Sequence, residues 1–203
     1  MKLGDIAQIK TGLVLSRKKA EMDFDAKATY KLLSVKNIDE DGLFINDSFD
    51  VFISNEVLEK HYFTEEGNIV MRLSHPYTAI YIDKEHSGLL IPSYFAIIKV
   101  KESITLPQFV AWYLNTINVK MELERAQAGS RIPSTNQHTL KNIPIKLPPI
   151  SKQKRLIEIF QLHQSEKKLY RRLIEEKEKF IQGLIQKIIG GEENDWNYYT
   201  REN

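Results

Sequence analysis

Cysteine is absent from this 203-residue sequence, and so are long apolar runs. Without thiols the chain can form neither a disulfide nor a thiolate zinc site. No stretch approaches the roughly 20 apolar residues that a membrane-spanning helix requires. The first ten residues also lack the apolar stretch of a signal peptide. We therefore expect no membrane partner and a cytoplasmic location.

Motifs for catalysis are missing as well. The sequence contains no Asn-Pro-Pro-Tyr motif of the kind found in base methyltransferases, and no glycine-rich loop between a strand and a helix. No two of its five histidines have an HxxH or HxxxH spacing, so no helix face offers two imidazole ligands. These absences predict a protein that is not an enzyme, holds no metal and needs no cofactor.

Charge is segregated along the chain, although the formal net charge is only +2. Residues 125–157 contain seven Lys or Arg and no Asp or Glu. Residues 39–66 contain nine acidic residues and a single base, Lys60. A basic segment without acids favours contact with a polyanion.

The first hundred residues are rich in strand signals. Residues 30–38, 68–73, 78–83 and 89–101 are dominated by β-branched and aromatic side chains, and Asp-Gly, Glu-Gly and Ser-Gly pairs separate them. Helix signals follow, so the order predicts an α+β domain, mostly β, over residues 1–150.

Two helices are predicted inside that domain. The first covers 106–126, with Thr105 as its cap and with Phe109, Tyr113 and Ile117 on one face. The second is short and begins after Ser134, which has the spacing of a capping box with the residue three positions later.

A much longer helix is predicted over residues 151–189, between Pro148-Pro149 and Gly190. At about 1.5 Å per residue it measures roughly 58 Å. Its apolar residues recur at coiled-coil spacing, which predicts pairing with a second helix through Phe160, Tyr170, Ile174, Ile181, Leu184 and Ile188. The alternative is a helix folded back on its own domain, which the two prolines disfavour because the residue before a proline is held extended. Residues 191–203 are expected to form a flexible tail.

Five short segments, taken in order, carry a family resemblance. They are LGDIAQIKTG at 3–12, LLSVKNIDEDG at 32–42, EEGNIVMRLS at 65–74, AGSRIPS at 128–134 and LPPISKQKRLIEIF at 147–160. Their order resembles that of the specificity (S) subunit of type I restriction-modification systems, in which the last segment has the form LPPL-x-EQ-x-x-I. Lys152 stands where that family usually has an acidic residue.

The resemblance implies a non-catalytic DNA reader. S subunits of this family hold target recognition domains that read short half-sites on double-stranded DNA, and they scaffold the methyltransferase (modification) and restriction subunits. This chain has one such domain and one long helix, so it resembles a half-subunit. Two copies are expected to pair as a homodimer, with antiparallel long helices whose length sets the spacing of an interrupted palindrome.

The residues that would contact DNA are expected in loops, because cations bind phosphates and Arg, Lys, Asn, Gln, Ser or Thr reach base edges. Three clusters and one weaker pair satisfy this chemistry: Lys10, Thr11, Arg17, Lys18 and Lys19; Arg72, Ser74, His75 and Tyr77; Ser130, Arg131, Ser134, Thr135, Asn136 and Gln137; and the pair Lys36 and Asn37.

Each cluster also has a structural explanation. Residues 17–19 are consistent with an ordinary solvated turn, and Arg72 with an ion pair to the acidic segment 39–66. Ser134 is a candidate helix cap with Gln137 as its partner, and residues 36–37 a turn before Asp39. A second function stays open, namely a protein-interaction adaptor of the same fold without DNA-reading activity, which the low net charge and the acidic segment 39–66 support.

Overall fold

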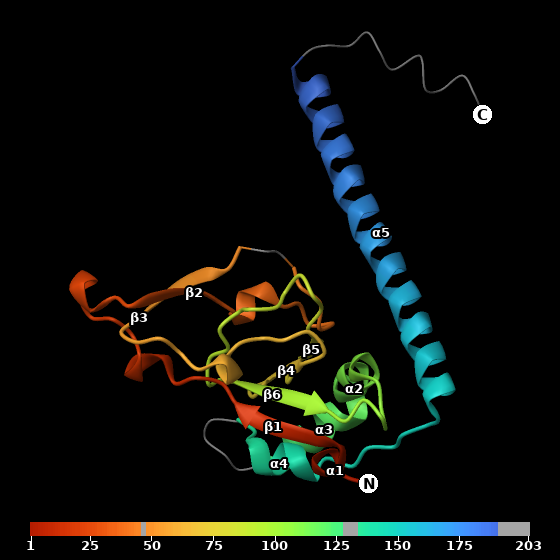
Figure 1. The fold of residues 1–203 in the computed structure, drawn as a ribbon. Helices are drawn as coiled ribbons and strands as arrows, with labels where there is room; N and C mark the ends of the chain where they lie inside the picture. Colours follow the sequence, from red (N-terminus) through yellow and green to blue (C-terminus); the bar gives the residue numbers. More distant parts are fainter. Residues whose placement is uncertain (46–47, 128–133, 191–203) are drawn as a thin grey trace. The chain divides into compact units, whose positions relative to one another are not determined.

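The computed structural model describes residues 1–45, 48–127 and 134–190 and divides into two compact units, Met1–Ile157 and Glu158–Asn203. The first unit is built around a four-stranded sheet with the order β1-β6-β4-β5. Its strands are β1 (Ala7–Thr11), β6 (Phe95–Val100), β4 (Ile69–Arg72) and β5 (Ala79–Tyr81), and neighbours are antiparallel. Figure 1 shows these strands side by side.

A two-stranded sheet of β2 (Ala28–Leu32) and β3 (Asp50–Ser54) completes the β structure. The strand predicted over 30–38 is confirmed only at its start, because the chain turns through the 3-10 helix η3 (Val35–Asn37). The strand predicted over 89–101 is confirmed only in its second half. Leu90 instead makes single bridges to Leu32 and Phe63.

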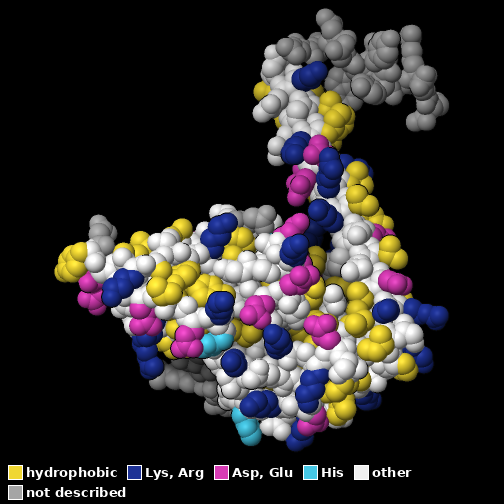
Figure 2. Space-filling view, viewed as in Figure 1, with side chains coloured by type: hydrophobic (Ala, Val, Ile, Leu, Met, Phe, Trp, Pro, Cys, Tyr) yellow, Lys and Arg dark blue, Asp and Glu magenta, His cyan; other side chains and the backbone are white. Residues whose placement is uncertain are grey.

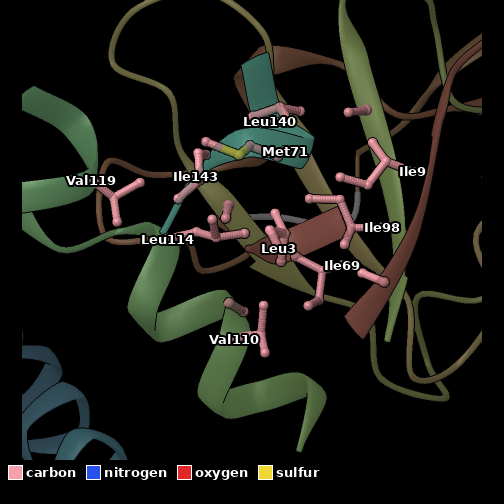
Figure 3. Packing of buried hydrophobic residues seen from close by; sticks show 14 of the residues in the cluster. Leu3, Ile9, Ile69, Met71, Ile98, Val110, Leu114, Val119, Leu140 and Ile143 are labelled. Carbon is pink, nitrogen blue, oxygen red and sulfur yellow. The ribbon is translucent and has the colours of Figure 1, made fainter. Parts of the chain in front are cut away.

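Helices cover one face of the four-stranded sheet. They are α1 (Leu3–Ile6), α2 (Pro107–Leu114), α3 (Ile117–Ala126) and α4 (Gln137–Asn142). Alternate residues of the strands point to this face, as the pleat requires, and Figure 3 shows Ile9, Ile69, Met71 and Ile98 packed with helix side chains. The helix residues of this core are Leu3, Ile6, Phe109, Val110, Ala111, Leu114, Val119, Leu123 and Leu140.

The opposite face of the same sheet is buried too. Val70, Ile80, Phe95 and Ile97 point there and pack with Leu33, Leu89 and Ile91. Because both faces are covered, polar side chains of the sheet reach solvent mainly at the ends and at the edge strand β1. The remaining short 3-10 helices are η1 (Leu15–Arg17), η2 (Asp23–Asp25) and η4 (Lys60–Tyr62).

The helix predicted over 106–126 is two helices, α2 and α3, which meet at Asn115 and Thr116. The Asn115 side chain accepts from Ala79 N at 2.9 Å and donates to Ala79 O at 2.6 Å, so it serves the edge strand β5 at the point where α2 ends. Ile117 consequently does not continue the buried face of Phe109, since it is 68% exposed. Leu106 caps α2, and Thr105 is buried beneath it.

The predicted long helix is confirmed as α5 (Ile150–Ile189), 40 residues and about 60 Å long. Its first turns belong to the first unit, where Gln153 is completely buried. Gln153 Oε1 accepts from Thr105 Oγ1 at 3.0 Å and from Leu106 N at 2.9 Å, and Nε2 donates to Pro148 O at 2.9 Å. The first two bonds anchor the base of α5 to the start of α2, and the third ties Gln153 to the segment just before α5.

Candidate nucleic-acid interface

Polar residues gather where β1 and β4 end and where β6 and β5 begin. The antiparallel register places Thr11 opposite Ala96, Arg72 opposite Phe95, and Met71 opposite Ala79, so four strand termini lie at one end of the sheet. We call this region, with the loop 73–78 and residues 134–137, the polar end of the sheet.

Segments far apart in the sequence meet there through hydrogen bonds. Ser74 forms an antiparallel bridge with Ser134, and Thr135 N donates to Leu73 O at 2.7 Å. Gln137 Nε2 donates to Thr11 Oγ1 at 3.0 Å. The structure therefore brings together the second cluster, the described residues 134–137 of the third cluster and the Thr11 end of the first cluster.

The rest of the first cluster is divided. Lys10 is exposed on β1, while residues 17–19 lie beside β3, since Lys19 pairs with Ser54. Lys18 Nζ forms an ion pair with Glu56 at 2.7 Å. Lys10, Arg17 and Lys19 are exposed and make no ion pair with any residue that the structure describes.

Arg72 is half-buried at the end of β4. Its Nε donates to Ser74 Oγ at 3.0 Å, which fixes the plane of the guanidinium. Within the described ranges Arg72 makes no ion pair, so the predicted alternative of pairing with the acidic segment is not observed there. Asp39 and Glu40 do line the same cleft as Arg72, about 110 Å³ in volume.

Three predicted contacts need correction, because their side chains are buried. Asn37 is 0%, Tyr77 1% and Thr135 3% exposed. Asn37 accepts from Ser34 N at 3.0 Å and donates to Ser48 O at 3.0 Å, so it shapes the turn before Asp39. None of the three reaches a ligand on the surface.

Tyr77 helps to form the turn of the loop between β4 and β5. Its φ of +54° lies in the left-handed region, which bulky residues seldom adopt, and its N–H donates to Ser74 O at 2.9 Å. Burial raises the pKa of the Tyr77 hydroxyl above its ordinary value, and the nearby Glu124 carboxylate raises it further. The loop is thus held by a buried ring.

The third cluster differs from its prediction in its cap. Asn136, and not Ser134, caps α4, because its Oδ1 accepts from Thr139 N at 3.0 Å. Ser134 and Asn136 remain exposed, and Gln137 is tied to β1. Ser130 and Arg131 lie outside the described residues.

The remaining predicted residues stand near the surface. The His75 side chain is 70% exposed, with Nε2 3.8 Å from Glu124 Oε1. Lys36 Nζ is paired with Asp50, at the start of β3. Sequence reasoning missed Tyr94, which is 40% exposed and whose carbonyl accepts from Leu73 N at 3.0 Å. Tyr94 lies at the polar end because β6 is placed between β1 and β4 in the sheet, and no local signal in the sequence predicts that strand order.

The long helix presents the predicted apolar stripe and a second one beside it. Tyr170, Ile174, Ile181 and Ile188 are 52% to 58% exposed, while Phe160 and Leu184 are half-buried. A second row was not predicted: Leu162, Leu169, Leu173 and Phe180 are 51% to 71% exposed. Figure 2 shows apolar side chains along this helix. At 3.6 residues per turn the two rows lie about a quarter turn apart.

A metal ion, a small molecule at the cleft beside Arg72 and a membrane would each require a particular feature in the described part of the chain. No group of three or more His, Asp or Glu side chains is assembled there in a way that would hold a metal ion. The cleft beside Arg72, at about 110 Å³, is well below the roughly 300–1,000 Å³ of ordinary small-molecule sites. None of the described helices combines the length and apolar character needed to cross a membrane.

Comparison with known families decides the assignment. Residues 1–178 match the family described as "Type I restriction modification DNA specificity domain". The chain belongs to this family. A search of curated proteins gave no match.

Solved specificity subunits share the fold of this family member. The HsdS subunit from Thermoanaerobacter tengcongensis superimposes with a TM-score of 0.65 at 16% identity, over 92% of this chain and 46% of that one. A chain from a study of complex assembly and conformational transition in a type I restriction-modification system gives 0.68 at 16% identity, over 93% and 47%. The chain thus spans about half the length of these two neighbours.

Proposed function

We propose that this type I specificity domain reads one half of a bipartite site on double-stranded DNA and has no catalytic activity of its own. The observation that carries the proposal is the polar end of the sheet. There, Arg72, Ser74, Ser134, Asn136 and Gln137 converge from segments 60 residues apart in the sequence. Membership of the DNA specificity family supports the same conclusion.

The basic residues and the polar end of the sheet have different roles in DNA binding: the first contact phosphates, and the second contacts bases. Lys10, Arg17 and Lys19 are exposed and not ion-paired within the described residues, which suits them to phosphates. The Arg72 guanidinium can bind two atoms of one base edge, whereas Asn136 uses its Oδ1 to cap α4 and offers its amide nitrogen as a donor. The phosphate contacts supply affinity, and the base contacts supply the choice of sequence.

The two apolar rows on α5 support two helical partners. A narrow seam suffices for one partner helix, whereas two rows a quarter turn apart provide contact for two. We assign the row of Ile174 and Ile181 to a second copy of the chain in antiparallel orientation, and the row of Leu169 and Leu173 to the methyltransferase subunit. The restriction subunit would join through the methyltransferase.

Salt dependence tests the DNA-binding part of this proposal. Binding of the full chain to a random-sequence duplex should weaken steeply with salt, with a log–log slope near −0.9 for each phosphate contacted. Lys10→Ala and Lys19→Ala should each flatten the slope by about one unit. Lys84→Ala is the matched control, because Lys84 is exposed beyond the opposite end of the sheet. A slope near zero for the unmodified chain would instead identify an adaptor.

The two helix surfaces can be separated by mutation. Ile174→Asp should give a folded monomer, because a carboxylate in the seam is not solvated there. Leu169→Asp should leave the dimer intact and abolish copurification with a coexpressed cognate methyltransferase subunit. Loss of the dimer in both variants would show that the rows form one surface.

A further inference from the structure

The cleft at the polar end has mixed charge and an apolar floor. Arg72, Asp39 and Glu40 line it together with Phe95 and Thr78, and it lies where β4 ends. The segment 35–40 forms one wall, and the loop 73–78 contributes to the other. At about 110 Å³ the cleft is too small for a cofactor, but it has room for the edge of a base.

Arg72 is arranged as a two-pronged donor. Because its Nε is committed to Ser74 Oγ, the two terminal nitrogens are the donors left for a ligand. They have no ion-pair partner in the described ranges. A planar fork of this kind matches the O6 and N7 acceptors that guanine presents in the major groove. Ser74 is therefore a positioning residue for Arg72.

The two carboxylates have different roles. Asp39 Oδ1 accepts from Asp41 N at 3.0 Å and from Leu43 N at 2.9 Å, so Asp39 stabilises its own turn. Glu40 is exposed and forms no hydrogen bond or ion pair with any described residue. A free carboxylate repels a phosphate, by about 1 kcal/mol at 4 Å in water and more near protein. It accepts well from the amino group of cytosine.

We infer that this cleft reads a G·C base pair in the major groove, with Arg72 on guanine O6 and N7 and Glu40 on the cytosine amino group. The inference rests on the proposed function and adds the identity of one base pair to it. The carboxylate decides between the two uses of Arg72, because a phosphate clamp would not place Glu40 beside it.

Sequence selection from a random duplex pool tests the inference with the full chain. The unmodified protein should select a half-site that contains a fixed G·C pair. Arg72→Ala should lose the preference at that pair only and bind the selected duplex about 5- to 150-fold more weakly, the loss expected for one bidentate base contact. Glu40→Ala should relax the same pair, and Lys84→Ala should change nothing.

A single-atom substitution in the DNA provides an independent measurement. Replacing the selected guanine by 7-deazaguanine removes the N7 acceptor and leaves O6 in place. This duplex should bind the unmodified protein several-fold more weakly and should bind the folded Arg72→Ala variant as well as the guanine duplex. Ser74→Ala should give an intermediate loss on the guanine duplex, because its Arg72 fork is no longer oriented.

The outcomes separate this inference from the proposed function. If the unmodified chain shows no salt-dependent binding and selects no sequence, the proposed function fails, and the inference fails with it. If the chain selects a half-site that Arg72→Ala leaves unchanged, only the inference is overturned. Equal losses for Arg72→Ala on every duplex would assign Arg72 to a phosphate and would overturn the inference too.

Discussion

Gln153 anchors the base of α5, and replacing it by Leu should destabilise the first unit by about 3 kcal/mol. The side chain is fully buried and forms three hydrogen bonds, to Thr105, Leu106 and Pro148. Each bond contributes about 1 kcal/mol net, and a buried group left without a partner costs about 1–3 kcal/mol. Leu has a similar volume, so the lost hydrogen bonds and not a cavity should dominate the change.

Urea denaturation followed by tryptophan fluorescence measures this loss. Trp112 in α2 packs against Phe109, with ring centroids 5.7 Å apart. In a Trp196→Phe background its signal alone reports unfolding of the first unit. Lys154→Ala, on an exposed position of the same helix turn, is the control and should change stability by less than about 0.5 kcal/mol.

A double-mutant cycle isolates the contact to Thr105. Thr105→Val should be destabilising in the unmodified chain, where it removes a partner of Gln153 Oε1, and close to neutral once Gln153→Leu is present. A stability of Gln153→Leu within about 0.5 kcal/mol of the parent would refute the anchoring argument. Additive effects of the two substitutions would refute the pairwise contact.

Three further outcomes are expected. Light scattering should find the full chain dimeric at tens of micromolar and Ile181→Asp monomeric, with unchanged fluorescence from the folded domain; a monomeric parent would contradict helix pairing. Inserting seven residues after Lys168 preserves the heptad register and adds about 10 Å of helix. The spacer between the two selected half-sites should therefore lengthen by about three base pairs at 3.4 Å each. An unchanged spacer would leave dimerisation as the helix's only role. Gly12→Ala should unfold or strongly destabilise the domain in thermal melts, because the added Cβ would lie 2.3 Å from Pro92 O and 2.4 Å from Ile91 O. A melting temperature equal to that of the parent would contradict this close approach.

The helix and strands that are determined by nearby residues, namely α5, β4 and β5, were predicted from the sequence. The 40-residue helix α5 follows from its apolar period and its proline and glycine ends, and β4 and β5 follow from β-branched runs. The break between α2 and α3 could not be predicted, because Asn115 ends α2 by bonding to Ala79, 36 residues away in the chain. Strand β3 was not predicted, because its five residues show only a short alternation of polar and apolar side chains.

The candidate site was predicted in composition but not in geometry. Polar residues suited to DNA contact were recognised by type, yet Tyr77 and Asn37 are buried, and burial depends on tertiary packing. Conversely, Tyr94 was overlooked because it belongs to no polar cluster in the sequence. The meeting of Thr11 with Gln137 depends on α4 lying against β1, which no local pattern encodes.

The bridge between Ser74 and Ser134, together with the bond from Thr135 N to Leu73 O, has a consequence for the diversification of this domain. Both ties use backbone atoms only, so they survive when the side chains at 74 and 134 are exchanged. Gly12 N likewise donates to Phe95 O at 3.0 Å through the main chain. These main-chain ties do not depend on the side chains at positions 74 and 134. Libraries randomised at those two positions can therefore be screened for new specificities while the main-chain frame is kept.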